Sequence, residues 1–198
     1  MLKRTFDVLS SISGLVLLLP LFLLIALWIK IDSKGPVFFR QQRVGRFGKT
    51  FFIHKFRTMR LDSEKSGRLT VGKDKRVTRS GYFLRKSKLD ELPQLIDVLI
   101  GQMSLVGPRP EVQEFIDCYP VEIRKKVLSV RPGITDRASI EMVDENEILS
   151  KYSEPRKAYI ENVLPIKQKY YLEYVESHNF FSDIKIIFDT LVKIIRRT

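Results

Sequence analysis

The most apolar part of the chain is residues 8–29, which contain no charged residue and only three serines to dilute the run. As a straight helix this segment would measure about 33 Å, enough to cross the hydrocarbon core of a bilayer. Pro20 lies in the middle of the run, where a proline removes a backbone donor and favours a kink. The pattern therefore predicts a retained membrane helix that bends near Pro20.

Basic residues flank this run on both sides. Lys3 and Arg4 precede it, and Lys30 and Lys34 follow it. Because cytoplasmic flanks of membrane segments are enriched in Lys and Arg, both flanks favour the cytoplasm, which a straight span cannot satisfy. A helix that bends and returns to the same face satisfies both. The residues alone leave the re-entrant helix and the kinked transmembrane helix open.

The rest of the chain favours helices with a small hairpin. Residues 36–39 and 50–56 are apolar clusters separated by a glycine-containing segment, which predicts two strands and a turn. Residues 63–80 are polar without a period, which is typical of a loop or flap. Residues 141–179 favour helices over the core. Residues 180–198 are amphipathic and predict a helix that either packs on the domain or lies in the membrane interface.

An acidic pair lies where another helix begins. Apolar residues recur at helical spacing over residues 89–99, and Pro93 is tolerated only in a first helical turn. The helix therefore starts close to this proline, or an earlier helix ends first. Either arrangement places Asp90 and Glu91 at a helix N-terminus.

Composition and charge narrow the class of protein. With 198 residues the chain is long enough for one domain. It holds 35 Lys and Arg against 23 Asp and Glu, which predicts an anionic partner: nucleic acid, a phosphorylated small molecule or an acidic membrane surface. One cysteine and two histidines argue against an internal disulfide and a Cys/His zinc site. Neither a Walker A motif nor G-x-G-x-x-G occurs, which argues against nucleotide binding by those routes.

Asp90 and Glu91 are candidates for phosphate chemistry in this basic setting. A helix N-terminus stabilises anions, and adjacent carboxylates suit Mg²⁺, which binds carboxylates together with substrate phosphates. One carboxylate could then attack phosphorus. Lys55 and Arg57, in "KFRTM", are candidate phosphate ligands. Acids in a first helical turn also complement the helix dipole without further function, so a purely structural role stays open.

Four segments, in order along the chain, resemble one family. They are "KRTFDVLSSISGL" at residues 3–15, "DSKGPVFFRQQRVGRFGKTFFIHKFRTM" at 32–59, "LRKSKLDELPQLIDVLIGQMSLVGPRPE" at 84–111 and "RPGIT" at 131–135. On these residues the chain resembles the bacterial sugar transferases of the small, monotopic phosphoglycosyl transferase type.

The resemblance implies an α+β, membrane-associated fold. A re-entrant helix would occupy residues 1–31, and a cytoplasmic catalytic domain residues 32–198. This domain would be compact and helical, with a small β-hairpin or sheet and interfacial amphipathic helices, the last of them at residues 180–198. The chain resembles the minimal catalytic form, without the multi-span N-terminal extension of longer members.

The resemblance also implies an activity. A phosphosugar would pass from a UDP-sugar to polyprenol (undecaprenyl) phosphate, giving a polyprenyl-diphosphate sugar and UMP and initiating a surface glycan. The expected course is a covalent aspartyl-phosphosugar intermediate assisted by Mg²⁺, at the cytoplasmic face of the bacterial inner membrane and among its lipids. No nucleic-acid partner is expected, and a homodimer stays open. The alternative is a catalytically silent membrane-surface module that binds lipid phosphate or scaffolds other enzymes.

Residues that match the family motifs take the corresponding roles. Asp90 would be the nucleophile, and Glu91 would support the metal or activate the incoming lipid phosphate, with both acids as metal ligands. Pro20 would be the membrane bend. Lys3 and Arg4 would hold the termini in the cytoplasm.

Five cations are the expected substrate ligands. In "GPRPE", the prolines on both sides of Arg109 fix its backbone. Residues 136–149 depart from the family pattern, so contacts to the sugar do not transfer to that stretch. The candidates are Lys55, Arg57, Arg109, Arg131 and Arg137.

Overall fold

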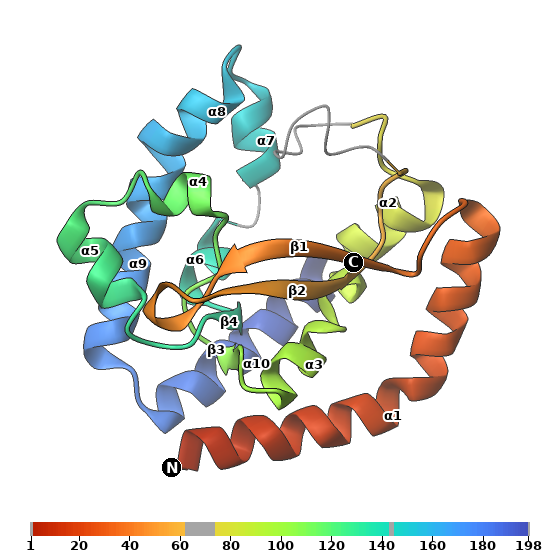
Figure 1. Ribbon diagram of the computed structural model, residues 1–198, viewed down its shortest axis with the longest axis horizontal. Coiled ribbons are helices and arrows are strands. Elements are labelled where there is room, and N and C mark those ends of the chain that lie inside the picture. The colour runs from red at the N-terminus through yellow and green to blue at the C-terminus, as the bar shows by residue number, and fades with distance from the viewer. Residues whose placement is uncertain (1, 62–73, 143–144, 198) are drawn as a thin grey trace.

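The computed structural model describes residues 2–61, 74–142 and 145–197, and most of the predicted loop at 63–80 lies outside them. Figure 1 shows a single body in which helices surround a two-stranded hairpin and one long helix lies along an edge. The predicted combination of helices with small sheets is confirmed. In chain order the elements are α1 (Leu2–Asp32), β1 (Phe38–Val44), η1 (Arg46–Gly48), β2 (Thr50–Phe56), α2 (Arg79–Lys86), η3 (Leu89–Glu91), α3 (Gln94–Leu99), β3 (Ser104–Val106), α4 (Gln113–Ile116), α5 (Val121–Val127), β4 (Gly133–Thr135), α6 (Arg137–Glu141), α7 (Glu145–Ser150), α8 (Pro155–Ala158), η4 (Tyr159–Val163), α9 (Leu164–Ser177) and α10 (Phe180–Arg197).

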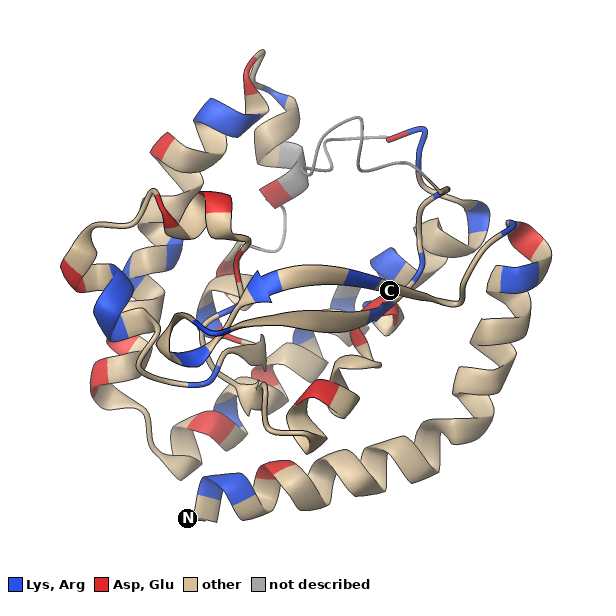
Figure 2. Cartoon of the chain, viewed as in Figure 1, with Lys and Arg blue, Asp and Glu red and all other residues tan. Residues whose placement is uncertain are grey.

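Helix α1 presents many apolar side chains to the outside. Leu17 is 78% exposed and Leu24 is 66% exposed. Among the described residues it is the one helix long and apolar enough to cross a membrane. Figure 1 shows the helix bending along its course, and Figure 2 shows charged residues only near its two ends. Pro20 lies inside the helix, and its missing backbone donor accounts for a bend in a helix that otherwise continues unbroken.

The N-terminal half of α1 is bonded to the body of the protein. Arg4 donates to the two last carbonyl oxygens of α3, at 2.7 and 3.0 Å. Asp7 is buried and accepts hydrogen bonds from the first two residues of β3, at 2.8 and 3.1 Å. Lys3 lies 2.6 Å from the buried carboxylate of Asp183 in α10. The basic pair at the N-terminus therefore forms internal contacts.

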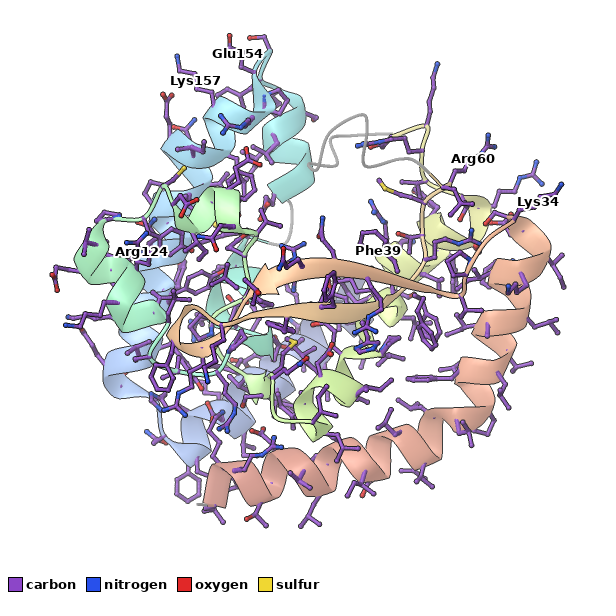
Figure 3. The ribbon with its side chains drawn as sticks, viewed as in Figure 1. Lys34, Phe39, Arg60, Arg124, Glu154 and Lys157 are labelled. Atoms are coloured by element: carbon purple, nitrogen blue, oxygen red, sulfur yellow. The ribbon has the colours of Figure 1, made fainter. Side chains whose placement is uncertain are left out.

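The C-terminal end of α1 is bonded to the same body. Arg57 donates to the carbonyl oxygens of Ser33 and Lys34, just beyond the helix. Asp32 accepts from the backbone and the hydroxyl of Ser80, at 2.9 and 2.7 Å. Figure 3 shows Lys34 at this end of the molecule, with its side chain pointing away from the body. Both ends of α1 thus dock on one compact domain.

Two small sheets form, and one of them was predicted. Strands β1 and β2 pair antiparallel with Phe38 opposite Phe56, and β1 extends beyond the apolar cluster at 36–39. Strands β3 and β4 pair in parallel. A Cβ atom on Gly133 would lie 2.1 Å from the backbone nitrogen of Gly107, so this close approach of two segments requires glycine.

The helices predicted in residues 141–179 are present as α7, α8, η4 and α9. They contribute Tyr159, Leu164 and Tyr171 to the largest apolar core. Helix α10 packs against β3 and α9 through Ile186, while Phe181 on its outer side is 80% exposed. One face of α10 therefore packs on the domain, and its predicted place in the membrane interface stays a prediction for the outer face.

Candidate active site

The acidic pair lies in a tight turn between two helices. Helix α2 ends at Lys86, and Lys88 has a left-handed backbone with φ of 58°. This conformation is uncommon for a residue other than glycine, and it turns the chain into η3. Asp90 and Glu91 lie in η3, which Leu92 and Pro93 connect to the start of α3. The predicted placement of the pair at a helix N-terminus is confirmed.

Glu91 is the centre of a buried ion cluster. Arg109 reaches both of its carboxylate oxygens, through Nη1 at 3.1 Å and through Nη2 in a shorter contact. Lys55 Nζ lies 2.9 Å from Oε1. Burial alone would raise the pKa of Glu91, but Arg109 and then Lys55 hold it well below its ordinary value. Glu91 is therefore ionised and bonded to two cations that come from β2 and from the segment after β3.

Asp90 has a different environment although it is the next residue. Its side chain is almost buried, and its carboxylate forms no hydrogen bond with the described part of the chain. Burial raises the pKa of Asp90, the negative charge of Glu91 raises it further, and Lys55 and Lys88 oppose both effects. A partly desolvated carboxylate without a fixed partner is a competent nucleophile once ionised.

Arg85 joins this site, and the sequence did not single it out. Its Nε donates to Thr58 Oγ1 at 2.9 Å, and burial lowers its pKa while the charge of Asp90 acts in the opposite direction. The available signal was its position five residues before Asp90, where the sequence left an earlier helix open, which brings its charge to the same turn. Arg85 adds a third cation to Lys55 and Arg109.

Three of the five predicted substrate ligands are not brought to the acidic pair. Arg57 donates to the chain just beyond α1, so its guanidinium stabilises the end of that helix. Arg131 donates to the Gly101 carbonyl at 2.9 Å. Arg137 forms an exposed ion pair with Glu141 within α6. The geometry therefore supports Lys55 and Arg109 as ligands and gives Arg57 another partner, while substrate binding by these three stays a prediction.

A buried polar network holds the segment that carries Arg109. The Tyr159 hydroxyl donates to Glu111 at 2.7 Å, and Lys167 donates to the same hydroxyl at 3.1 Å. Arg43 donates to a backbone carbonyl of the same segment at 3.2 Å. Sequence analysis missed this network because its members lie far apart in the chain and share no local pattern.

Asp90 offers oxygen atoms of the kind that Mg²⁺ binds. Its carboxylate has no hydrogen-bond partner among the described residues, and Mg²⁺ often takes one or two carboxylates and completes its shell with water and substrate phosphates. Both oxygens of Glu91 are bonded to cations. No group of three His, Cys, Asp or Glu side chains converges in the described ranges. The residues fit a metal held by Asp90 and phosphate, and Glu91 could join only after releasing a cation.

Comparison with known proteins gives one consistent family. The family model described as "Bacterial sugar transferase" matches residues 1–197. The chain is 37% identical over 193 residues to the UDP-N-acetylgalactosamine-undecaprenyl-phosphate N-acetylgalactosaminephosphotransferase of Aeromonas hydrophila. It is 38% identical over 197 residues to the UDP-glucose:undecaprenyl-phosphate glucose-1-phosphate transferase of Escherichia coli.

The fraction of each relative that the alignment covers differs between the relatives. The alignments cover 96% and 98% of this chain but only 43% of the Aeromonas protein and 40% of the Escherichia protein. The exopolysaccharide production protein PSS of Rhizobium leguminosarum is 37% identical over 211 residues, which cover 99% of this chain and 96% of that protein. The chain thus spans less than half of two relatives and nearly all of the third.

Proposed function

The chain belongs to the bacterial sugar transferase family, and from this premise we propose that it transfers a sugar phosphate from a UDP-sugar to undecaprenyl phosphate. The products would be a polyprenyl-diphosphate sugar, which initiates a surface glycan, and UMP. The observation that carries the proposal is the contrast between the two acids. The carboxylate of Asp90 has no hydrogen-bond partner in the described ranges, whereas that of the adjacent Glu91 is bonded to Arg109 and Lys55.

The proposed reaction has two displacements at one phosphorus atom. A carboxylate oxygen of Asp90 attacks the phosphorus that bears the sugar, and the bond between this phosphorus and the bridging oxygen breaks, so UMP leaves with the electron pair. An oxygen of undecaprenyl phosphate then attacks the same phosphorus. The bond to Asp90 breaks and the carboxylate is restored.

Charge repulsion is the main obstacle to both displacements, because every nucleophile and every substrate is an anion. The cationic side chains of Lys55, Arg85 and Arg109 surround the turn that carries Asp90 and lower this cost. Mg²⁺ held by Asp90, with Glu91 as the second predicted ligand, would neutralise further charge on the phosphate oxygens when bound. Ionised Asp90 is required in the first step, so the reaction should slow as this residue is protonated.

The proposed location is the cytoplasmic face of the bacterial inner membrane, with α1 as a re-entrant helix. A straight helix of 31 residues would place its ends about 45 Å apart, on opposite sides of a bilayer. In this chain Lys3, Arg4 and Asp7 bond one end to the body, and Asp32 bonds the other end to it. Attachment of both ends to one domain supports a helix that enters and leaves on the same side.

The test is UMP release by the detergent-solubilised protein with undecaprenyl phosphate, Mg²⁺ and a panel of UDP-sugars. We expect release with at least one sugar and its loss in Asp90→Asn. A protein that binds lipid phosphate but releases no UMP across the panel would favour the silent membrane module.

A further inference from the structure

Glu91 lies where the site could hold a phosphate. Arg109 contacts both carboxylate oxygens through two nitrogens, and Lys55 contacts one of these oxygens from a second direction. The arginine fork fits carboxylate and phosphate oxygens equally, and lysine adds a point charge. The three side chains keep between 12% and 26% exposure, so the cluster is accessible from the surface.

The cluster carries more positive than negative charge. Two cations meet one carboxylate, and Asp90 shares neither a hydrogen bond nor a salt bridge with them. Arg43 is a further cation, and its charge contributes to lowering the pKa of Lys55. An anion with more charge than a carboxylate, such as a diphosphate, would compete well for the same two cations.

We propose that Glu91 is a placeholder for a phosphate of the donor. Its carboxylate occupies an oxyanion site formed by Arg109 and Lys55, and the diphosphate of the incoming donor displaces it. The identity of the ligand rests on the proposed function. The existence of the oxyanion site rests only on the contacts of Arg109 and Lys55 with Glu91. Displacement frees the carboxylate of Glu91 beside Asp90 only when a donor is present.

The exchange has a consequence for affinity. A ligand that must displace an internal group binds more weakly than it would to the bare cations, in the same way that a rarely populated competent state lowers apparent affinity. Single phosphates and other small anions are thereby kept out of the site. Removal of the placeholder should strengthen anion binding even while it impairs turnover.

The test is titration calorimetry of inorganic pyrophosphate into the full-length, detergent-solubilised protein with divalent metals chelated. We expect Glu91→Gln to lower the pyrophosphate Kd at least about tenfold relative to the unmodified protein. Asp90→Asn is the matched control, because it removes the same charge from the adjacent residue without touching either cation. Its gain in affinity should be clearly smaller.

Several results would overturn the proposal. Equal gains in the two variants would mean that general electrostatics, and not displacement, controls binding. An unchanged Kd in Glu91→Gln would mean that Arg109 and Lys55 do not receive the anion. Inorganic phosphate that binds Glu91→Gln as tightly as pyrophosphate would refute the assignment to a diphosphate.

A second variant covers the case in which Glu91→Gln fails to fold. Glu91→Asp keeps the charge but is one methylene shorter, so it cannot hold both cations in the same way. We expect it to bind pyrophosphate more tightly than the unmodified protein, and no gain would contradict the placeholder. Absence of UMP release with every donor would refute the proposed function and leave these binding results intact.

Discussion

Opposite effects on stability are expected from neutralising the two adjacent acids. Glu91→Gln removes the carboxylate that Arg109 and Lys55 both contact, and it leaves two poorly hydrated cations without this partner. Asp90→Asn removes a charge that is nearly buried and forms no hydrogen bond with the described residues. Both substitutions keep the size of the side chain, so packing changes little.

The expected loss of stability in Glu91→Gln follows from the burial of its ion pairs. Breaking a buried ion pair costs about 3–5 kcal/mol, and we expect the lower end because Arg109 keeps 26% of its side chain exposed. For a chain of this size that loss corresponds to a fall in Tm of about 6–12 °C. Because the pKa of Glu91 is lowered, this stability is present above the pKa of the unfolded chain and is lost as pH falls through the folded value.

For Asp90 the dependence of stability on pH has the opposite sign. Burial, and then the charge of Glu91, raises its pKa, so the folded state holds this proton more tightly than the unfolded state. Stability from this group is full below the unfolded pKa and decreases as pH rises through the folded pKa. At neutral pH the ionised carboxylate lowers stability, because burial and the charge of Glu91 favour its protonated form, and Asn removes this cost. Asp90→Asn should therefore melt at or above the temperature of the unmodified protein.

The assay is thermal unfolding in detergent, in phosphate-free buffer at pH 7.5 with metals chelated. Glu141→Gln is a suitable control, since it makes the same chemical change in an exposed pair with Arg137, which should cost less than about 1 kcal/mol. A Glu91→Gln protein that melts like this control would refute the buried cluster. A fall in Tm of the same size in Asp90→Asn would refute the asymmetry between the two acids.

Three further predictions concern pH and the ends of α1. Activity should fall at low pH with an apparent pKa above 3.8, the ordinary pKa of Asp, because burial raises the pKa of Asp90. An apparent pKa at or below 3.8 in the pH profile of activity would contradict the buried environment of Asp90. Arg57→Met should lower the Tm by about 2–12 °C, since carbonyls beyond α1 lose a donor, and Arg57→Lys should recover part of this loss. Pro20→Leu should straighten α1, so that a thiol introduced by Leu2→Cys becomes labelled from outside spheroplasts; labelling only after lysis would refute the role of Pro20.

Local patterns predicted the elements whose cause is local. The apolar run and Pro20 predicted a long apolar helix with a bend, and the apolar clusters on either side of the glycines predicted the hairpin. Helical periodicity and Pro93 predicted the position of Asp90 and Glu91, because the first turn of a helix is where a proline and acids are both tolerated.

These local patterns did not predict contacts between segments that lie far apart in the chain. The parallel pair β3 and β4 consists of two three-residue strands, too short to show an alternation. Arg57 follows Lys55 by two residues, yet it bonds to the chain beyond α1 while Lys55 bonds to Glu91. Only the tertiary arrangement separates a cation that binds the acidic pair from one that closes a helix.

The most direct measurement of the central claim is the intact mass of the protein after incubation with a productive UDP-sugar and Mg²⁺ in the absence of the polyprenol acceptor. We predict an added mass of one sugar phosphate, mapped to the peptide that contains Asp90, with one equivalent of UMP released and no adduct in Asp90→Asn. Release of UMP that needs the acceptor, with no adduct at any residue, would contradict Asp90 as the nucleophile.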